Sequence, residues 1–225
     1  MNIAVVIPVL NEQKVIGSTL SNLNAIGVNE IIVVDGGSTD RTREIASEAG
    51  ARVVAAPRGR GRQMNEGARL AQGKILLFLH ADTRLPRSAL EDIRRALSDP
   101  AYVGGRFDVS LDGDRWIFKV VGALISLRSR LSRVATGDQA IFIRKEVFQQ
   151  LGGFPDISLM EDIALSRMLK KRGKVACLRS RVITSSRRWE REGIWSTILK
   201  MWLLRLLYLA GICPRGLKQY YGEAR

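Results

Sequence analysis

Short apolar runs alternate with longer polar stretches in the first half of the chain. Four such runs, rich in Val, Ile, Leu and Ala, lie at residues 3–7, 31–34, 53–56 and 75–79. Continuous apolar runs of this length are typical of strands that are buried on both faces of a parallel sheet. The stretches between them are long enough for helices that return across the sheet, at residues 13–24, 41–49 and 63–72. The pattern therefore predicts an α/β fold with an open, mostly parallel sheet flanked by helices.

Polar and charged segments follow each apolar run directly. They are Pro8-Val-Leu-Asn-Glu12, Asp35-Gly-Gly-Ser-Thr-Asp40, Arg58-Gly-Arg-Gly-Arg62 and His80-Ala-Asp-Thr83. Ligands of open α/β sheets bind at the carboxyl ends of the strands. We therefore expect Glu12, Asp35 and Asp82 around one crevice with the arginines opposite, as in a site for a nucleotide and a divalent cation. Each acid taken singly could instead belong to a solvated loop or a helix cap.

These motifs resemble those of family 2 glycosyltransferases of the GT-A fold, in particular a compact bacterial single-domain subgroup. The family's first strand ends in Pro-x-x-Asn-Glu and its second in Asp-Gly-Ser-x-Asp, which Gly37 stretches here. The resemblance continues through Arg62–Gly67, residues 80–82, Glu161-Asp162 and Arg187-Arg-Trp189, and it covers roughly residues 1–190. It implies a GT-A domain over 1–190 that moves a sugar from a nucleotide-diphosphate donor, most often a UDP-sugar, to a hydroxyl acceptor with inversion.

The resemblance also implies roles for the residues around the nucleotide. Pro8, Leu10 and Glu12 would form the loop beside the base, and Asp35 would accept a hydrogen bond from the uracil N3–H. A buried acceptor rejects a base that lacks the matching donor. Arg62 would lie near the base or the phosphates. The bland interpretation of residues 58–62 is a solvated basic loop, but their glycines permit a close approach to an anion.

The acidic metal motif of the family falls on residues 80–82. Asp82 is the expected ligand, because hard oxygen donors suit Mn²⁺ or Mg²⁺, and the ion would stabilise the diphosphate leaving group. His80 stands where the family usually has an aspartate. It could contact the ribose or the metal, or it could be a structural residue.

The resemblance implies Asp162 as the general base, with Glu161 as its neighbour. Both residues precede an amphipathic stretch, so helix capping explains them equally well, and the field at a helix start tends to lower a carboxyl pKa. The diphosphate or acceptor side would be lined by Asp138, Gln139, Arg187, Arg188 and Trp189. No Gln precedes Arg187-Arg-Trp189 as in processive members, so polymerisation is not expected.

Charge is distributed unevenly along the chain, which has 225 residues and a formal net charge of +14. Residues 163–225 hold 15 Lys and Arg against 3 Asp and Glu, a net charge of +12. This asymmetry favours an anionic partner such as a membrane surface or a phosphorylated lipid acceptor. Aromatic residues make up only 6%, so nucleic acid is the weaker choice. With 2 cysteines and 1 histidine, a Cys/His zinc site is excluded.

Residues 191–225 form a basic, apolar C-terminal extension that we expect to be helical. Lys200 and Arg205 interrupt its apolar stretch, 194–212, so a membrane-spanning helix of about 20 apolar residues is not expected. Three interpretations remain: a helix lying in an anionic membrane surface, flanked by basic residues that include Arg215 and Lys218; a homodimer face; or a helix packed on the sheet. The chain starts without a basic, apolar leader, so we expect it in the cytoplasm, where it could be peripheral on the membrane.

Two other functions fit the sequence less well. A glycosyltransferase-like scaffold could have lost catalysis with the acid at position 80 and could bind anionic lipid, but Asp82 and Asp162 are both present. A nucleotidyltransferase of related architecture would carry a Gly-rich phosphate loop after the first strand, where this chain has Pro8-Val-Leu-Asn-Glu12.

Overall fold

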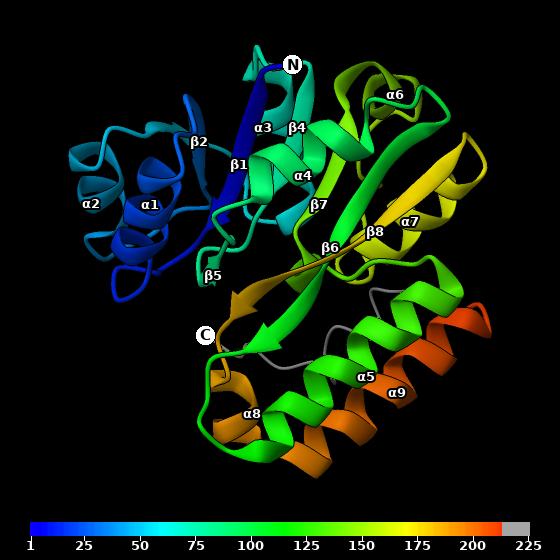
Figure 1. Ribbon diagram of the computed structural model, residues 1–225. Coiled ribbons are helices and arrows are strands. Elements are labelled where there is room, and N and C mark those ends of the chain that lie inside the picture. Colours follow the sequence, from blue (N-terminus) through cyan, green and yellow to red (C-terminus); the bar gives the residue numbers. More distant parts are fainter. Residues whose placement is uncertain (213–225) are drawn as a thin grey trace.

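The computed structural model describes residues 1–212. Its strands join into one sheet in the order β3-β2-β1-β4-β7-β6-β8-β5 (Figure 1). The strands are β1 Ile3–Val9, β2 Glu30–Asp35, β3 Arg52–Ala55, β4 Ile75–Phe78, β5 Thr83–Arg84, β6 Tyr102–Leu111, β7 Ile141–Arg144 and β8 Lys174–Thr184. The helices are α1 Ile16–Ala25, α2 Thr42–Glu48, α3 Arg60–Leu70, α4 Ala89–Ala96, α5 Trp116–Ser132, the 3₁₀ turn η1 Gly137–Gln139, α6 Lys145–Gln150, α7 Glu161–Lys170, α8 Arg187–Glu192 and α9 Ile194–Leu209.

The four apolar runs of the sequence form the parallel half of the sheet. β1 lies between β2 and β4, and β3 pairs with β2 at the edge, all in parallel. Both faces of β1, β2 and β4 are buried, with Val5, Ile7 and Leu77 in one core and Val6, Val34 and Leu76 in the other, whereas the edge strand β3 is partly exposed. The predicted α/β architecture with an open, mostly parallel sheet is confirmed, because strands buried on both faces need helices above and below.

Helices cover the two faces of the sheet in separate sets. The side chains of α1, α2 and α4 contribute to the core on one face, whereas those of α3, α6 and α7 contribute to the core on the other. The helix predicted over 63–72 begins earlier than expected, at Arg60, directly after Gly59 with its φ of 145°. Arg60 and Arg62 therefore lie in the first turn of a helix and not in an extended loop.

The second half of the chain completes the sheet with longer strands. β7 is antiparallel to both β4 and β6, and β8 runs parallel to β6. β6 and β8 reach beyond the other strands towards α5, α8 and α9, which lie together at one end of the molecule (Figure 1). Phe118 and Val121 of α5 and Ile194 of α9 share one buried cluster.

The C-terminal apolar stretch is helical, as predicted, and one side of it packs on the body of the protein. Ile194, Thr197 and Leu204 of α9 are buried, and Leu204 packs against Met160 and Ile163 at the start of α7. Among the described residues, none of the helices combines the length and apolar character that a membrane span requires. Arg215 and Lys218, predicted to flank this helix, lie outside the described residues.

Candidate active site

The carboxyl ends of β1 and β2 form the first wall of the candidate site. Asp35, the last residue of β2, is 2% exposed, and its carboxylate accepts hydrogen bonds from the backbone N–H of Gly37 (3.2 Å) and Ser38 (3.1 Å). The two loops are also joined to each other, because the Asn11 N–H donates to Ser38 Oγ at 2.9 Å. An ionised carboxylate has about four acceptor positions. Asp35 therefore keeps capacity for a further donor from a ligand.

Gln63 holds this wall together, and sequence reasoning missed it. Its buried side-chain amide donates to the carbonyl oxygens of Val9 and Val34, both at 2.8 Å. These carbonyls belong to the ends of β1 and β2. Gly36 lies so close that an added Cβ would be 3.0 Å from Gln63 Nε2. The only sequence signal was a glutamine in an arginine-rich segment, and such a residue is ordinarily exposed.

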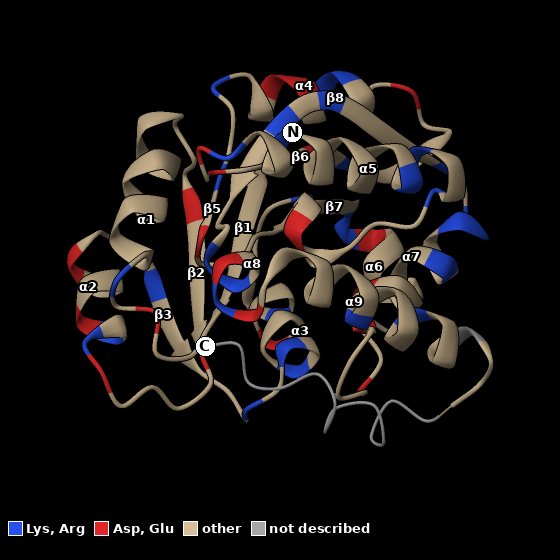
Figure 2. Cartoon of the chain, turned by 90° about the horizontal axis from the view of Figure 1, so that it is seen from below, with Lys and Arg blue, Asp and Glu red and all other residues tan. Residues whose placement is uncertain are grey.

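A guanidinium lies between two of the predicted strand-end carboxylates. Arg187 Nη2 is 3.2 Å from Asp82 Oδ2 and 3.4 Å from Glu12 Oε2. Glu12 comes from the β1 loop, Asp82 from the β4 loop, and Arg187 from the start of α8. Figure 2, which looks onto the carboxyl ends of the strands, shows acidic and basic segments close together around α8. One cation thus bridges both carboxylates.

The same two carboxylates fit a divalent ion. Mg²⁺ in nucleotide sites is typically bound by one or two carboxylates, with substrate phosphates and waters as the other ligands. Asp82 and Glu12 supply that number, although residues 1–212 contain no cluster of three or more His, Cys, Asp or Glu that could hold a metal unaided. Binding at these two carboxylates requires Arg187 to move away from them, since two cations cannot share one position.

The second wall contains the predicted base. Asp162 lies in the first turn of α7, where its Oδ2 accepts a hydrogen bond from Gly137 N–H and its Oδ1 one from Ile163 N–H, both at 2.7 Å. Glu161 is 3% exposed, and Arg60 Nη1 lies 3.5 Å from its Oε1. A narrow cavity joins these residues to His80 and is lined by Arg60, Met64, Phe78, His80, Gly137, Ile141, Phe154, Glu161 and Asp162.

Burial and the adjacent Glu161 raise the pKa of Asp162 above the ordinary aspartate value. Arg60 and the two backbone donors act in the opposite direction, but they do not outweigh burial. The sequence pointed to a lowered pKa from the helix start. In the structure the pKa of Asp162 is raised instead, because the desolvation of the carboxylate by burial has a larger effect than the helix start.

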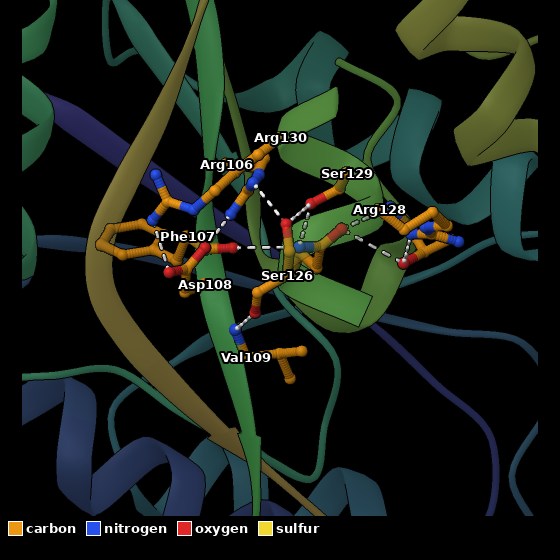
Figure 3. A network of polar contacts seen from close by, with 10 residues as sticks. Arg106, Phe107, Asp108, Val109, Ser126, Arg128, Ser129 and Arg130 are labelled. Carbon is orange, nitrogen blue, oxygen red and sulfur yellow. Dashed lines mark hydrogen bonds and ion pairs between the residues drawn. The ribbon is translucent and has the colours of Figure 1, made fainter. Parts of the chain in front are cut away.

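A polar network positions the turn that contacts Asp162 (Figure 3). The fully buried side-chain amide of Gln139 donates to Ser129 Oγ of α5 at 2.8 Å and to the Phe107 carbonyl of β6 at 3.3 Å. Gln139 was expected to line the diphosphate or acceptor side, but it faces α5 and β6. Its role in the fold is to hold η1. Gly137 at the start of η1 passes so close to His80 that an added Cβ would lie 2.4 Å from Nε2.

The network continues into a buried ion cluster between β6 and α5. The Asp108 carboxylate lies between the guanidinium groups of Arg106 and Arg130, and Arg130 Nη2 is 2.5 Å from Asp108 Oδ2 (Figure 3). Arg106 is 1% exposed and also donates to the Ser126 carbonyl at 3.1 Å. A buried charge left without its partner is strongly destabilising. This cluster therefore fixes α5 against β6.

Two arginines from separate helices lie within electrostatic range of Asp162. The charges of Asp138 and Asp162 act on both Arg128 of α5 and Arg205 of α9. Burial, followed by the charge of Arg205, lowers the pKa of Arg128 to about 10, so Arg128 stays protonated at neutral pH. Burial raises the pKa of Asp138, whose Oδ1 is enclosed with no hydrogen-bond partner among the described residues.

The remaining predicted residues are spread around this centre. Arg62 extends to the surface, where it forms a two-point ion pair with Asp156 at 2.7 and 2.8 Å, so in this arrangement it does not point towards a nucleotide. Arg188 Nε lies 3.3 Å from Glu192. Trp189 packs into the apolar cluster between α5 and α9 and does not line the cavity. Pro8 is a buried residue of β1, and Leu10 is half-buried after it.

The chain is similar to known sequences and structures. The model of the family described as "Glycosyl transferase family 2" matches residues 4–152. A Mycobacterium bovis protein named PGL/p-HBAD biosynthesis glycosyltransferase is 31% identical over 166 residues, covering 67% of this chain and 62% of that protein. Glucosyl-3-phosphoglycerate synthase of Mycolicibacterium paratuberculosis is 35% identical over 92 residues, covering 36% of this chain and 28% of that protein. The matches thus span less than two thirds of these curated relatives.

Two groups of solved structures share the fold. S. aureus TarS has a TM-score of 0.69 at 18% identity, covering 84% of this chain and 61% of that one. Glucosyl-3-phosphoglycerate synthase from Mycobacterium tuberculosis has a TM-score of 0.65 at 23% identity, covering 94% and 80%. The family model matches well over half of the chain, residues 4–152 of 225. The chain belongs to glycosyl transferase family 2.

Proposed function

We propose that the protein transfers a sugar from a UDP-sugar to a hydroxyl acceptor with inversion at the anomeric carbon. The observation that carries this proposal is Asp162, a carboxylate of raised pKa held by two backbone N–H groups in a cavity beside the strand ends. In the reaction, Asp162 takes the proton of the acceptor hydroxyl. The oxygen of that hydroxyl then bonds to the anomeric carbon of the sugar, and the bond between this carbon and the diphosphate oxygen breaks. Glu161 contributes by keeping the Asp162 pKa raised.

The strand-end wall would hold the donor. Asp35, with acceptor capacity left, pairs with the uracil N3–H beside the loop of Pro8, Leu10 and Glu12, and His80 lies at the end of β4 near the ribose. Asp82 and Glu12 would hold Mn²⁺ or Mg²⁺, which supplies Lewis acidity to the diphosphate when bound. Solved structures of the M. tuberculosis synthase include complexes with UDP and Mg²⁺, and with UDP-glucose and Mn²⁺.

Arg187 would change partners when the donor binds. Its guanidinium bridges Glu12 and Asp82. A diphosphate next to these carboxylates offers more negative charge and bidentate geometry, which arginine prefers. Arg187, with Arg188 beside it, therefore contacts the diphosphate, while Asp138, Arg128 and Arg205 lie on the acceptor side. Arg62 joins the phosphates only if it leaves Asp156.

We further propose that residues 1–190 form the transfer domain and that residues 191–225 form a basic C-terminal extension, whose helix α9 lies on the acceptor side. Arg205 of α9 supports this division, because it reaches the charges of Asp138 and Asp162. The acceptor is a hydroxyl compound that is lipid-linked, and the enzyme acts in the cytoplasm at the membrane. The basic extension supports both points.

The donor pose is tested by Asp35→Ala. The loss of one hydrogen bond to a charged acceptor should weaken UDP binding by about 1.5–3 kcal/mol. Calorimetric titration with UDP measures this loss. Asp114→Ala is the matched control, since Asp114 is exposed in the loop before α5 and should leave the affinity unchanged. An affinity equal to that of the wild type in Asp35→Ala contradicts the pose.

The raised pKa of Asp162 predicts the acid side of the pH profile. A general base must be ionised, so kcat/KM should fall as the pH drops through a value above about 3.9, the ordinary aspartate pKa. Glu161→Gln removes one of the causes that raise this pKa, so the acid limb should move to lower pH. Steady-state rates at saturating metal across the acid range measure the shift. A limb that stays in place in Glu161→Gln means that another group controls it.

A further inference from the structure

α5 carries a stripe of large apolar side chains that face solvent. Its members are Trp116, Val120, Leu124, Leu127 and Leu131, and they range from 40% exposed at Val120 to 80% at Leu131. Their spacing of three or four residues places them on one face of the helix. The opposite face, with Phe118, Val121 and Ser126, is buried in the protein. The exposed face of α5 is therefore apolar, and no element of residues 1–212 covers it.

α9 carries a matching stripe. Trp195, Leu199, Trp202, Leu203 and Leu206 are between 53% and 75% exposed, whereas Ile194, Thr197 and Leu204 on the other side are buried. A helix that is apolar on all sides is normally buried on all sides. The outer half of α9 departs from this rule, because it is apolar and exposed. This half is therefore suited to binding an apolar partner.

We name the two exposed stripes together the α5–α9 face. α5 and α9 lie side by side (Figure 1), and Phe118 and Ile125 of α5 share a cluster with Ile194 and Ile198 of α9. Their inner sides are thus in contact, and their outer sides are exposed together. Contiguous apolar patches on this scale mark interaction sites. Figure 2 shows both helices mostly tan with blue bands.

Charge decides which partner this face suits. The sequences of α5 and α9 contain Lys and Arg but no Asp or Glu. Arg115, Lys119 and Arg191 at its margins are exposed, while Lys200 is paired with Glu192 at 2.7 Å. A second copy of the chain would bring two basic faces together, with no acid from either helix to offset them. An anionic bilayer supplies the opposite charge, and Trp at the edge of an apolar face favours the headgroup level.

We propose that the α5–α9 face docks in the plane of an anionic lipid bilayer. Docking there brings the lipid surface to the outer side of α5, and Arg128 of the same helix donates to Thr136 Oγ1 at 3.3 Å, next to the Gly137 N–H that contacts Asp162. The sequence suggested a membrane contact for residues 194–212 alone. The structure adds α5, which supplies half of the face. The docking does not depend on the proposed chemistry, and its test needs no turnover.

The test is flotation of the full chain with vesicles. Vesicles of phosphatidylcholine with about one third phosphatidylglycerol should bind the protein at ~0.1 M salt at least tenfold more strongly than pure phosphatidylcholine vesicles do. At ~1 M salt the preference for the anionic vesicles should shrink, because the screening length falls to about 3 Å, while the apolar contribution remains. Binding to neither vesicle type at low salt, or equal binding to both, overturns the proposal.

Variants separate the two contributions. Leu124→Ser combined with Leu203→Ser should weaken partitioning at least about tenfold on both vesicle types. Ile183→Ser, on the 40% exposed Ile183 of β8, is the matched control outside the α5–α9 face and should bind as the wild type does. Lys119→Glu with Arg191→Glu should weaken binding to the anionic vesicles alone. Unchanged thermal unfolding midpoints establish that each variant is folded.

Light scattering provides the opposing outcome. If the wild type is a dimer that does not float, and the double Leu→Ser variant is a monomer, the α5–α9 face binds a second copy and the membrane proposal is wrong. Wild-type binding by the double Leu→Ser variant also overturns it, because the exposed stripes would then contribute nothing.

Discussion

Replacement of Asp162 by Asn should reduce sugar transfer by about 10²–10⁴-fold, the usual contribution of general-base catalysis. The amide keeps the size of the side chain, and its oxygen can still accept the hydrogen bond from Gly137 that the carboxylate accepts at 2.7 Å. The turn η1 should therefore stay in place. What is lost is the ability to take a proton from the acceptor hydroxyl. This is the largest single effect that we expect in the active site.

The measurement pairs turnover with donor binding. Release of UDP in the presence of acceptor should fall in Asp162→Asn, while the dissociation constant of UDP should stay close to that of the wild type, because Asp162 lies on the acceptor side. Asp114→Asn is the control, since Asp114 is an exposed acid in the loop before α5, away from the proposed donor and acceptor residues. If Asp162→Asn keeps near wild-type turnover while Glu161→Gln loses it, then Glu161 is the general base and Asp162 is its neighbour.

Asp82→Ala should remove most of the effect of metal on UDP affinity. Changes to residues that merely support a metal ligand cost about 10–100-fold in metal affinity, so loss of a ligand itself should cost at least as much. Calorimetry with UDP, with and without Mn²⁺, measures the difference. The wild type should bind UDP more strongly with Mn²⁺, and Asp82→Ala should show nearly the same affinity in both conditions. Retained metal dependence excludes Asp82 as the principal ligand.

Arg187→Ala provides the complementary measurement at the same place. Arg187 occupies the position between Glu12 and Asp82. Its removal should strengthen Mn²⁺ binding without nucleotide, because like charges on the two carboxylates are then uncompensated. The same variant should weaken UDP binding, since a contact to the diphosphate is lost. A variant that changes both affinities in the same direction contradicts the exchange of partners proposed for Arg187.

The sequence by itself determined the parallel half of the fold. Its four apolar runs correspond to β1, β2, β3 and β4, and for β1, β2 and β4 the reason is that a strand buried on both faces needs an uninterrupted apolar run, which is visible without neighbours. The placement of Glu12, Asp35 and Asp82 at the strand ends followed from the same pattern. Family motifs then extended the prediction to Asp162, which the structure places in a cavity that His80, at the end of β4, also lines.

Only the tertiary structure decided which polar residues face the cavity and which position the strand ends and turns around it. Gln139 and Gln63 have the same side chain, and both are fully engaged in positioning strand ends and turns, a role that depends on partners up to 54 residues away in the chain. Trp189 and Arg62 also have partners that are distant in the chain. Trp189 packs in a core cluster with residues of α5, and Arg62 pairs with Asp156 at the surface. Side-chain partners that are distant in sequence leave no periodic signal.

The electrostatic character of Asp162 and the α5–α9 face also required the structure. Local sequence places Asp162 at a helix start, where its pKa should fall, but burial depends on the packing of η1, α3 and α7 around it, and burial raises that pKa. The apolar positions of α5 and α9 look like core positions in a sequence, because hydrophobicity does not tell which side of a helix is covered. The packing of the two helices against each other and against the body buries one side of each and leaves the other exposed.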